Sequence, residues 1–483
     1  MTYTFNDVNS DNLDTLKSNI EQVLKNEESS ERVALAKEGV DYYKNKTAIL
    51  NATQVYYDED GNEQTDPTKA NNKLRHSFYP LLVKQKVGYL VGKPMNFMCD
   101  DTKVFEYIKS VLGEKWDSTV QTLVTAASNK GEEWLYCYID HEGKFDYVVC
   151  PMEQIVPLYD NTFKTRLMGI IRHYKVVNLA NEEVTHVEYW TLEKVMYFED
   201  SGGGLEYMGD APHFTVNEQG YSFGLLPFVQ FKNNEDMTND LSLVKDLIDN
   251  YDKVTSGLAN DLDDIQQAIY VLKGYQGTDP VEFQKNLRFY RLIKVDEQGG
   301  VSKLEVNIPV TAKDSHLNRL EADIYRMGMG VDVSAEKLGN SSGVALKFIY
   351  SLLDLKCDMV EIQFKKGIKH LLGLMSAWYG VINGTPFDRN TVKCTFNRSL
   401  IINTKEMITN VVNSNRLVSG KTMLANHPFV TDVDFELEQM MKEGITPLWQ
   451  DTQENTDDSG DTPQIDDNMT SGGYENTGDN NTD

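Results

Sequence analysis

One segment of the chain comes close to a phosphate-binding loop: Gly88-Tyr-Leu-Val-Gly92-Lys93-Pro94. A loop that cradles nucleotide phosphates has four residues between its two glycines, and a Ser or Thr after the lysine to bind Mg²⁺. Here three residues separate the glycines, and Pro94 stands at the magnesium-binding position. The segment is therefore better interpreted as a helix that ends at Gly-Lys-Pro.

Other catalytic patterns are missing from the sequence. It contains neither HExxH nor GxSxG, and its eight histidines and five cysteines are scattered without metal-ligand spacing. Asp261, Asp263 and Asp264 are close in sequence, but on a continuous helix their carboxylates would not converge on one ion, so a solvated acidic face explains them better. The sequence thus predicts no catalytic residue, no cofactor and no metal site, and a protein that is not an enzyme.

The chain is strongly acidic. Its 483 residues hold 47 Lys and Arg against 74 Asp and Glu, a net charge of −27. This argues against a broad basic face that grips nucleic acid, because such binding depends on neutralising phosphates, but it is compatible with a protein that lets nucleic acid pass. The first residues show no signal peptide, and the apolar stretch Leu371–Ile382 is about half a membrane span. With five scattered cysteines, we expect a soluble protein of a reducing compartment that binds no membrane.

The first 239 residues have the pattern of an α+β region. Helical spacing of apolar residues indicates helices over 11–47 and 73–90. The segment 132–150 is rich in aromatic and β-branched residues around a His-Glu-Gly turn, which predicts a hairpin. Strand-like runs follow at 166–177, 184–192 and 194–199, so we expect an antiparallel meander.

A heptad seam begins near residue 240. Its apolar positions recur in steps of three and four, which predicts one helix over 240–265 with a length of about 39 Å. The other faces of this helix carry seven aspartates against two lysines, which is typical of a solvated acidic face. The seam consists of Leu241, Val244, Ile248, Tyr251, Thr255, Leu258, Leu262 and Ile265.

An insert of different composition follows at 268–310. Six basic residues against five acidic ones make it nearly neutral, and its pattern predicts a small α/β unit with a Gly-Gly turn. A helix then returns at 311–328. Thr311 and Asp314 resemble a capping box at its start, and Gly328 and Gly330 are expected to stop it. Its predicted apolar stripe consists of Leu317, Leu320, Ile324 and Met327.

The longest helical signal, about 342–379, comes after a polar loop and predicts a helix of about 55 Å. Leu353, Met359 and Phe364 are among the residues that mark its expected apolar side. A strand-like piece at 391–402 and short helices over 404–444 follow. The last segment, 450–483, holds ten acidic residues and no Lys or Arg, which predicts a disordered acidic tail.

Two stretches carry a resemblance to a known family. NNKLRHSFYPLLVKQKVGYLVGKPMNF at 71–97 and GNSSGVALKFIYSLLDLKCD at 339–358 resemble the portal proteins of tailed bacteriophages, in particular those of long, non-contractile-tailed phages of Gram-positive hosts. The order of the predicted elements is similar to that family from about residue 10 to 446. The acidic tail lies outside the resemblance.

The resemblance implies an α+β, mainly helical portal fold and a ring, usually of twelve subunits, at one capsid vertex. Such a ring is the channel for double-stranded DNA during packaging and ejection, and the docking platform for the terminase motor and the head–tail adaptor. Major capsid and scaffolding proteins are further implied partners. The expected localisation is the virion, with the host cytoplasm during assembly.

The family's parts fall on definite ranges of this chain. Their expected boundaries are a wing at 1–239, to which 383–403 returns; stem helices at 240–267 and 311–328; a clip at 268–310; a tunnel loop at 329–342; a long bridging helix at 343–382; a helical crown at 404–446; and the disordered acidic tail at 450–483.

An acidic channel wall would keep DNA from binding tightly, because like charges repel within a Debye length. The expected lining residues of the stem are Asp246, Asp249, Lys253 and Asp264. The heptad seam is expected to offer an apolar edge on which neighbouring subunits pack.

In the clip, Arg288, Arg291 and Lys294 form a basic run that could meet an acidic partner. Salt bridges at the surface or between subunits explain these three residues equally well.

Two other classes of function remain open at this stage. A nuclease or ATPase acting on viral DNA is disfavoured by the missing phosphate loop and metal cluster. A structural head-completion or minor capsid protein without a DNA channel is disfavoured by the long heptad helix with its insert.

The tunnel loop yields a test. The resemblance places it at the narrowest point of the channel, where Lys337, Asn340, Ser341 and Ser342 would make weak, sequence-independent phosphate contacts. Alternatively, Lys337 pairs with Glu336, and Asn340 or Ser341 caps the long helix.

If Lys337 guides DNA, Lys337→Glu should leave rings and motor docking normal but shorten the packaged DNA or impair its retention. The length of DNase-protected DNA measures this effect. Full-length packaging at the normal rate in the variant would exclude a guiding role for Lys337.

Overall fold

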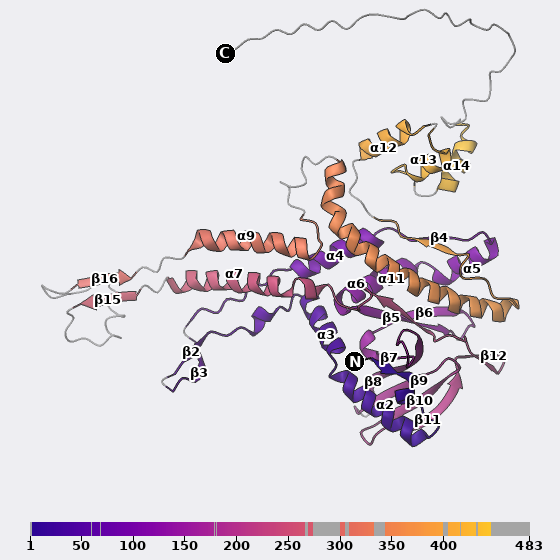
Figure 1. Cartoon of the computed structure of the whole chain (residues 1–483), viewed down its shortest axis with the longest axis horizontal. Coiled ribbons are helices and arrows are strands. Elements are labelled where there is room, and N and C mark those ends of the chain that lie inside the picture. The colour runs from indigo at the N-terminus through magenta and orange to yellow at the C-terminus, as the bar shows by residue number, and fades with distance from the viewer. Residues whose placement is uncertain are drawn as a thin grey trace, which may run out of the picture. The chain divides into compact units, whose positions relative to one another are not determined.

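A computed structural model of the chain describes residues 2–265, 269–273, 300–304, 309–332, 343–398 and 404–445, apart from 59, 68, 178, 180, 416, 431 and 432. The chain divides into two compact units, Met1–Ile401 and Ile402–Asp483. The described elements mix helices and antiparallel sheets, so the α+β fold class is confirmed (Figure 1). No helix among the described residues has the length and apolar character needed to cross a bilayer.

The N-terminal helical region is broken where one helix was predicted. The first helix ends at Glu28, and a new helix begins after Ser30, whose side chain caps it by accepting a hydrogen bond from the backbone N–H of Val33. The single helix predicted over 11–47 is therefore wrong. The elements here are β1 (Tyr3–Thr4), α1 (Phe5–Val8), α2 (Leu13–Glu28), α3 (Glu31–Tyr43) and the 3₁₀ turn η1 (Ala48–Asn51).

A six-stranded sheet contains the predicted meander. Its order is β1-β7-β8-β9-β10-β11, antiparallel except for the parallel pair β1–β7. Buried residues of α2, among them Leu16 and Ile20, pack on Val156 and Leu158 of this sheet. The meander prediction is thus confirmed. The remaining strands of the sheet are β7 (Ile155–Tyr159), β8 (Leu167–Val177), β9 (Glu183–Trp190), β10 (Lys194–Asp200) and β11 (Glu206–Pro212).

The predicted hairpin at 132–150 is confirmed, and it belongs to a second sheet. Its strands pair with β14 in the order β14-β5-β6, and Trp134 lies opposite Cys150. Trp134 and Phe228 of this sheet share a core cluster with Ile155 of the six-stranded sheet, so the two sheets pack on each other. The elements are β5 (Glu132–Ile139), β6 (Phe145–Cys150), the 3₁₀ turn η2 (Met152–Gln154) and β14 (Phe228–Lys232).

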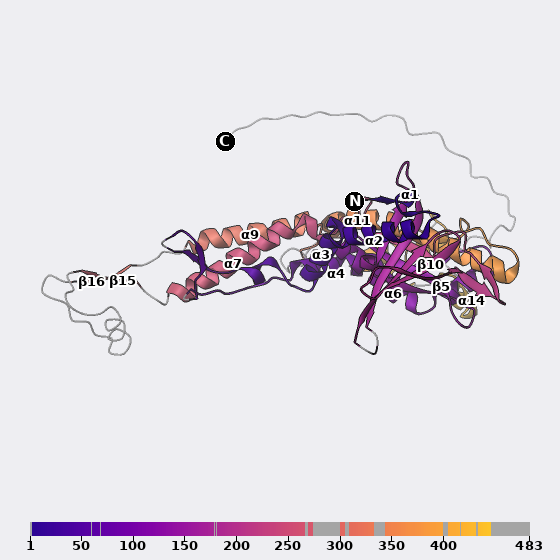
Figure 2. The ribbon, with the colours of Figure 1, turned by 90° about the horizontal axis from the view of Figure 1, so that it is seen from below.

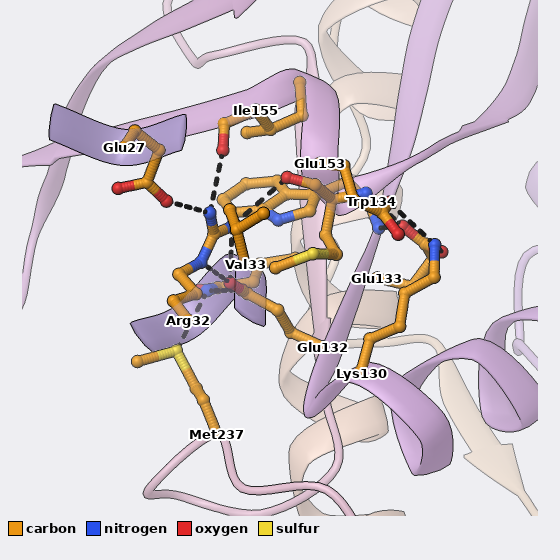
Figure 3. Close-up of polar contacts among 12 residues, drawn as sticks. Glu27, Arg32, Val33, Lys130, Glu132, Glu133, Trp134, Glu153, Ile155 and Met237 are labelled. Carbon is orange, nitrogen blue, oxygen red and sulfur yellow. Dashed lines mark hydrogen bonds and ion pairs between the residues drawn. The ribbon is translucent and has the colours of Figure 1, made fainter. Parts of the chain in front are cut away.

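Arg32 of α3 joins this helix to both sheets, through an ion pair to one and a hydrogen bond to the other (Figure 3). The guanidinium of Arg32 lies 2.7 Å from the carboxylates of Glu27 and Glu132, and it donates to the carbonyl of Ile155. In the same region Lys130 bridges Glu133 and Glu153 at 2.9 and 2.8 Å. Because such groups are costly to bury unpaired, the pairs of Arg32 define where α3 meets β5, and those of Lys130 define where the C-terminal end of the preceding helix meets β5 and the 3₁₀ turn η2.

The largest core forms where α11 (Gly343–Asn383) packs on α6 and β14. This 41-residue helix confirms the predicted long helix, and buried Leu353 and Phe364 lie on its predicted apolar side. Met359 does not: it is exposed, because it points away from this core. The other helices of the region are α4 (Phe78–Val91), α5 (Thr102–Leu112) and α6 (Lys115–Lys130).

The heptad region forms α7 (Lys245–Ile265), preceded by the 3₁₀ turn η3 (Leu241–Leu243), and α7 lies beside α9 (Val310–Met327) in both views (Figures 1 and 2). The capping box predicted at Thr311 is wrong, because α9 begins one residue earlier and Pro309 precedes it. Of the predicted insert, the described part is the antiparallel pair β15 (Ile269–Lys273) and β16 (Gly300–Leu304).

Three small two-stranded sheets complete the first unit. Of the strand-like signal at 391–402, the described part up to residue 398 contains a strand of three residues, which pairs with β4. These sheets are β2 (Val55–Tyr57) with β3 (Glu63–Thr65), β4 (Asn96–Met98) with β17 (Lys393–Thr395), and β12 (Phe214–Val216) with β13 (Gln219–Tyr221).

The second unit contains the short helices predicted over 404–444, which are confirmed as α12 (Thr404–Asn413), α13 (Gly420–Ala425) and α14 (Val433–Lys442). Ser419 caps α13 through a hydrogen bond from the backbone N–H of Thr422.

His370 makes the stability of the α11 core depend on pH. Burial lowers the pKa of His370 from 6.5 to about 4, partly offset by a hydrogen bond of 3.1 Å between Nε2 and the carbonyl of Leu226. Between these pH values the unfolded chain binds a proton that the folded chain does not. Stability from this group is therefore complete above pH 6.5 and is lost as the pH falls towards 4.

We expect this group to account for a loss of up to about 3 kcal/mol of unfolding free energy on acidification from pH 7 to pH 4. His370→Gln keeps a hydrogen-bond donor but cannot titrate, so the variant should lose correspondingly less. Urea unfolding at both pH values measures the difference. Equal losses in the variant and the parent would contradict the assignment.

Candidate functional site: a helix pair and the ion cluster at its base

Helices α7 and α9 form an antiparallel pair, here called the helix pair. Gly328, just after α9, lies against Val244 before α7, while Lys313 near the start of α9 pairs with Asp261 near the end of α7 at 2.5 Å. Gly328 and Gly330 have no room for a Cβ, because one would come within 2.6 and 2.2 Å of Leu82. They permit close packing, whereas the residue with positive φ at this turn is Met329.

The first half of the heptad seam is buried within the subunit. Leu241, Val244 and Ile248 pack with residues of α4, among them Leu82, and with Ile324 of α9. The seam cannot use these positions to contact a neighbouring subunit, so that expectation is wrong for 241–248. Further along, Leu262 is exposed.

A row of polar side chains, the polar ladder, occupies another face of α7. Asp252, Ser256 and Asn260 are spaced by four residues and are buried. They accept hydrogen bonds from the backbone N–H groups of His76, Leu74 and Asn72, at 2.9, 2.9 and 2.6 Å respectively. Four helical residues rise about 6 Å and two extended residues about 6.6 Å, so the helix and the extended segment stay in register.

The ladder explains one wrong prediction. A helix was expected from residue 73, but α4 begins at Phe78. The preceding backbone is extended because α7 binds its alternate N–H groups. Asp252 also accepts a hydrogen bond from the hydroxyl of Thr47 at 2.6 Å and lies 2.8 Å from Nδ1 of His76, so its carboxylate belongs to the interior of the subunit.

An ion cluster of Lys86, Asp240 and Lys356 lies at the base of the helix pair. The ammonium groups of Lys86 and Lys356 each lie 3.0 Å from Oδ2 of Asp240. Lys356 also donates to the carbonyl of Gly328 at 3.0 Å, and Lys86 donates to the side chain of Asn233. The cluster thus joins α4, the start of the α7 region, the end of α9, and α11.

Burial and charge set the protonation of this cluster. Burial alone would raise the pKa of Asp240, but the ammonium groups of Lys356 and Lys86 hold it well below its ordinary value. Burial lowers the pKa of Lys86, since Asp240 compensates its charge only in part and Lys356 repels it. The buried carboxylate of Asp240 is therefore the shared counterion of two lysines.

The two stretches that carry the family resemblance meet at this site. The stretch 71–97 supplies the segment bound by the polar ladder, and also Lys86; the stretch 339–358 supplies Lys356. The resemblance pointed to these stretches, but spacing alone gave no sign that Asp240 and Asp252 are buried. A lysine within an apolar helical run, as at Lys86, was the available signal.

The expected channel-lining residues have different surroundings. Asp246 and Lys253 are exposed on α7. Asp249 is half-buried, accepts a hydrogen bond from the hydroxyl of Tyr42 at 2.6 Å and pairs with Lys245 at 3.1 Å. The side chain of Asp264 lies outside the described residues. Residues wholly outside them are Arg288, Arg291 and Lys294 of the insert, and Lys337, Asn340, Ser341 and Ser342 of the loop.

No group of three or more His, Cys, Asp or Glu side chains in the described part of the chain is placed to hold a metal ion. Asp261 pairs with Lys313, whereas Asp263 accepts a hydrogen bond from the amide of Asn72 at 2.7 Å. These two carboxylates therefore have separate partners.

Removing the charge of Asp240 should destabilise the subunit strongly, because two buried ammonium groups lose their counterion. We expect Asp240→Asn to lower the unfolding free energy by about 3 kcal/mol or more. Asp210→Asn is the matched control, since it removes an exposed pair with Lys194 that solvent screens, and it should have a much smaller effect. Urea denaturation compares the two variants, and equal effects would show that the cluster does not hold the helix pair.

Comparisons with known proteins agree with the resemblance in the two stretches. A family model described as phage portal protein, SPP1 Gp6-like, matches residues 23–446. The portal protein of Bacillus phage SPP1 is 34% identical over 415 residues, covering 84% of this chain and 82% of the relative. The portal protein of Clostridium phage phiCD119 is also 34% identical over 415 residues, covering 81% and 89%.

Two solved structures show a weaker likeness. A chain in the neck of an empty GTA particle has a TM-score of 0.43 and 9% identity, over 73% of this chain and 90% of that one. A chain in the virion of a native gene transfer agent particle has a TM-score of 0.39 and 10% identity, over 77% and 90%. The assignment rests on the sequence matches, which span most of the chain: this protein belongs to the SPP1 Gp6-like family of phage portal proteins.

Proposed function

We propose that twelve copies of this portal protein close into a ring whose channel is lined by the helix pair. Portal proteins form a ring in the phage head, act as the channel for double-stranded DNA and dock the terminase. For this chain, the number of subunits, the channel wall and the identity of each docking surface belong to the proposal.

The observation that carries the proposal is the charge of the helix pair. Asp246, Asp261 and Asp263 are exposed on α7, while the cations Lys245 and Lys313 are engaged in ion pairs. The exposed cations of the pair are Lys253 on α7 and Arg319 and Arg326 on α9, so the negative surface that a ring of these helices would present is the face of α7 around Asp246. It would repel the duplex within about 8–10 Å at physiological salt, so DNA could slide without sticking. Exposed Lys253 would then provide a weak contact.

The remaining parts take the roles that the order of elements suggests. Residues 1–239 with 383–403 form the wing, 240–267 and 311–328 the stem, and 343–382 the bridging helix. The nearly neutral segment 268–310 would be the clip, where the terminase motor and later the head–tail adaptor dock, with Arg288, Arg291 and Lys294 facing acidic partners.

The loop 329–342 would line the narrowest point, with Lys337, Asn340, Ser341 and Ser342 near the duplex. Residues 404–446 would form the crown. Major capsid and scaffolding proteins would meet the ring in the host cytoplasm during assembly, before it is locked into the virion.

We further propose that the protein performs no catalysis itself and that the motor supplies nucleotide hydrolysis. Gly88 and Val91 lie within α4, so the backbone amides there belong to a helix and not to an open loop that could cradle phosphates. A nucleotide-hydrolysis assay on the purified protein tests this statement directly.

Electron microscopy and native mass measurement of purified protein test the ring. Closed rings of twelve subunits with a central hole support the proposal. Particles without a hole would favour a head-completion protein without a channel, and monomers or dimers at micromolar concentration would refute the ring.

Reversing a charge on the channel wall should slow DNA movement. We expect Asp246→Lys to form normal rings but to package DNA several-fold more slowly at low salt, with recovery at high salt, because twelve new cations would bind phosphate. Glu106→Lys, an equal charge change on an exposed position of α5, is the control. Packaging by the Asp246→Lys ring at the parental rate and salt dependence would place Asp246 away from DNA.

A further inference from the structure

Helix α11 has two apolar faces, and only one is buried by the subunit. Leu353, Val360 and Phe364 belong to the main core. A second row, here called the exposed stripe, follows steps of four and three residues along the helix. Its members and exposed fractions are Phe348 76%, Leu352 39%, Leu355 52%, Met359 42% and Ile362 57%.

The spacing of the exposed stripe is that of a helix-packing seam. At 100° per residue its five members fall within an arc of roughly 80° on the helix surface, and they extend over about 21 Å. Steps of four and three are the repeat by which one helix packs against another. Among the described helices, α11 alone continues such exposed large apolar residues over four steps.

A charged border runs along one side of the stripe. Asp354, Asp358 and Glu361 are held by Arg398, which pairs with all three. An apolar centre with an ordered polar rim is the usual composition of a protein interface. A contiguous apolar patch of this kind on a subunit marks a surface that another protein covers.

We propose that the exposed stripe is covered by a second copy of this chain, the adjacent subunit of the ring. This inference rests on the proposed ring. The first half of the α7 seam packs on α4 and α9 of its own subunit, so the exposed stripe is the longest continuous apolar row that the described helices leave for a contact between subunits. The exposed stripe lies on α11, the proposed bridging helix, and its spacing suits a helical partner.

Ring closure adds a geometric requirement. In a cyclic ring each contact joins two different surfaces, since self-complementary contacts give closed dimers instead. The stripe of one copy therefore meets a different surface of the next copy. Because every copy carries the same substitution, a change in the stripe alters one of the two surfaces at every contact in the ring.

The test compares two double variants that place charge on equally exposed apolar positions. Leu355→Glu with Met359→Glu changes the stripe, whereas Val176→Glu with Val177→Glu changes β8, where the exposed fractions are 42% and 61%. Native mass measurement at micromolar concentration gives the fraction in rings, and circular dichroism checks folding. We expect at least a tenfold loss of rings for the stripe variant, with unchanged helical content, and normal rings for the β8 variant.

A second measurement covers the case in which the stripe variant fails to fold. A photo-crosslinking amino acid at position 355 of the otherwise unchanged protein should give a product of twice the chain mass. Rings in the stripe variant would overturn the inference, and so would crosslinks confined to one chain or formed only with other head proteins. Absence of rings in the parent protein refutes the proposed function instead, so the two failures are distinguishable.

Discussion

The carboxylate of Asp240 determines how the helix pair joins the rest of the subunit. Lys86 from α4 and Lys356 from α11 both depend on it for their counter-charge. Two ammonium groups on one carboxylate leave excess positive charge in a buried place. Asn233 accepts a further hydrogen bond from Lys86, and the carbonyl of Gly328 accepts one from Lys356, which reduces the cost of burying this charge. Since Asp240 precedes α7 and Gly328 follows α9, one cluster anchors both helices of the pair at its base.

The polar ladder extends this anchoring along α7. Asp252, Ser256 and Asn260 hold an extended segment through its backbone N–H groups, so this part of the contact depends on register. The side chains of His76 and Asn72 add contacts to Asp252 and Asp263. As a result α7 has three different surfaces: an apolar one against α4 and α9, a buried polar one, and an exposed acidic one. A helix packed on two sides is well suited to present the third at a fixed position, which an electrostatic channel wall requires.

Helix α11 also uses different faces for different contacts. One face completes the core, Lys356 reaches the base of the helix pair, and the exposed stripe faces outward. If a neighbouring subunit displaced this helix, Lys356 would move relative to Asp240 and their ion pair would change. The stripe and Lys356 lie on the same helix, so contacts in the ring and the position of the channel wall are mechanically connected in the proposed assembly.

The sequence by itself determined the class of the fold, the meander, the hairpin, the long helix and the acidic character of α7, because periodicity and turn residues act within a few positions of the chain. It could not show that 11–47 contains two helices, that residues before Phe78 are extended, or that Met359 points away from the core. Nor could it distinguish buried Asp240 and Asp252 from exposed Asp246. All these aspartates look alike in a helical pattern. Whether a carboxylate is solvated or buried depends on the partners that distant segments bring to it, here Lys86, Lys356 and the backbone of His76, and only the tertiary structure brings those partners together.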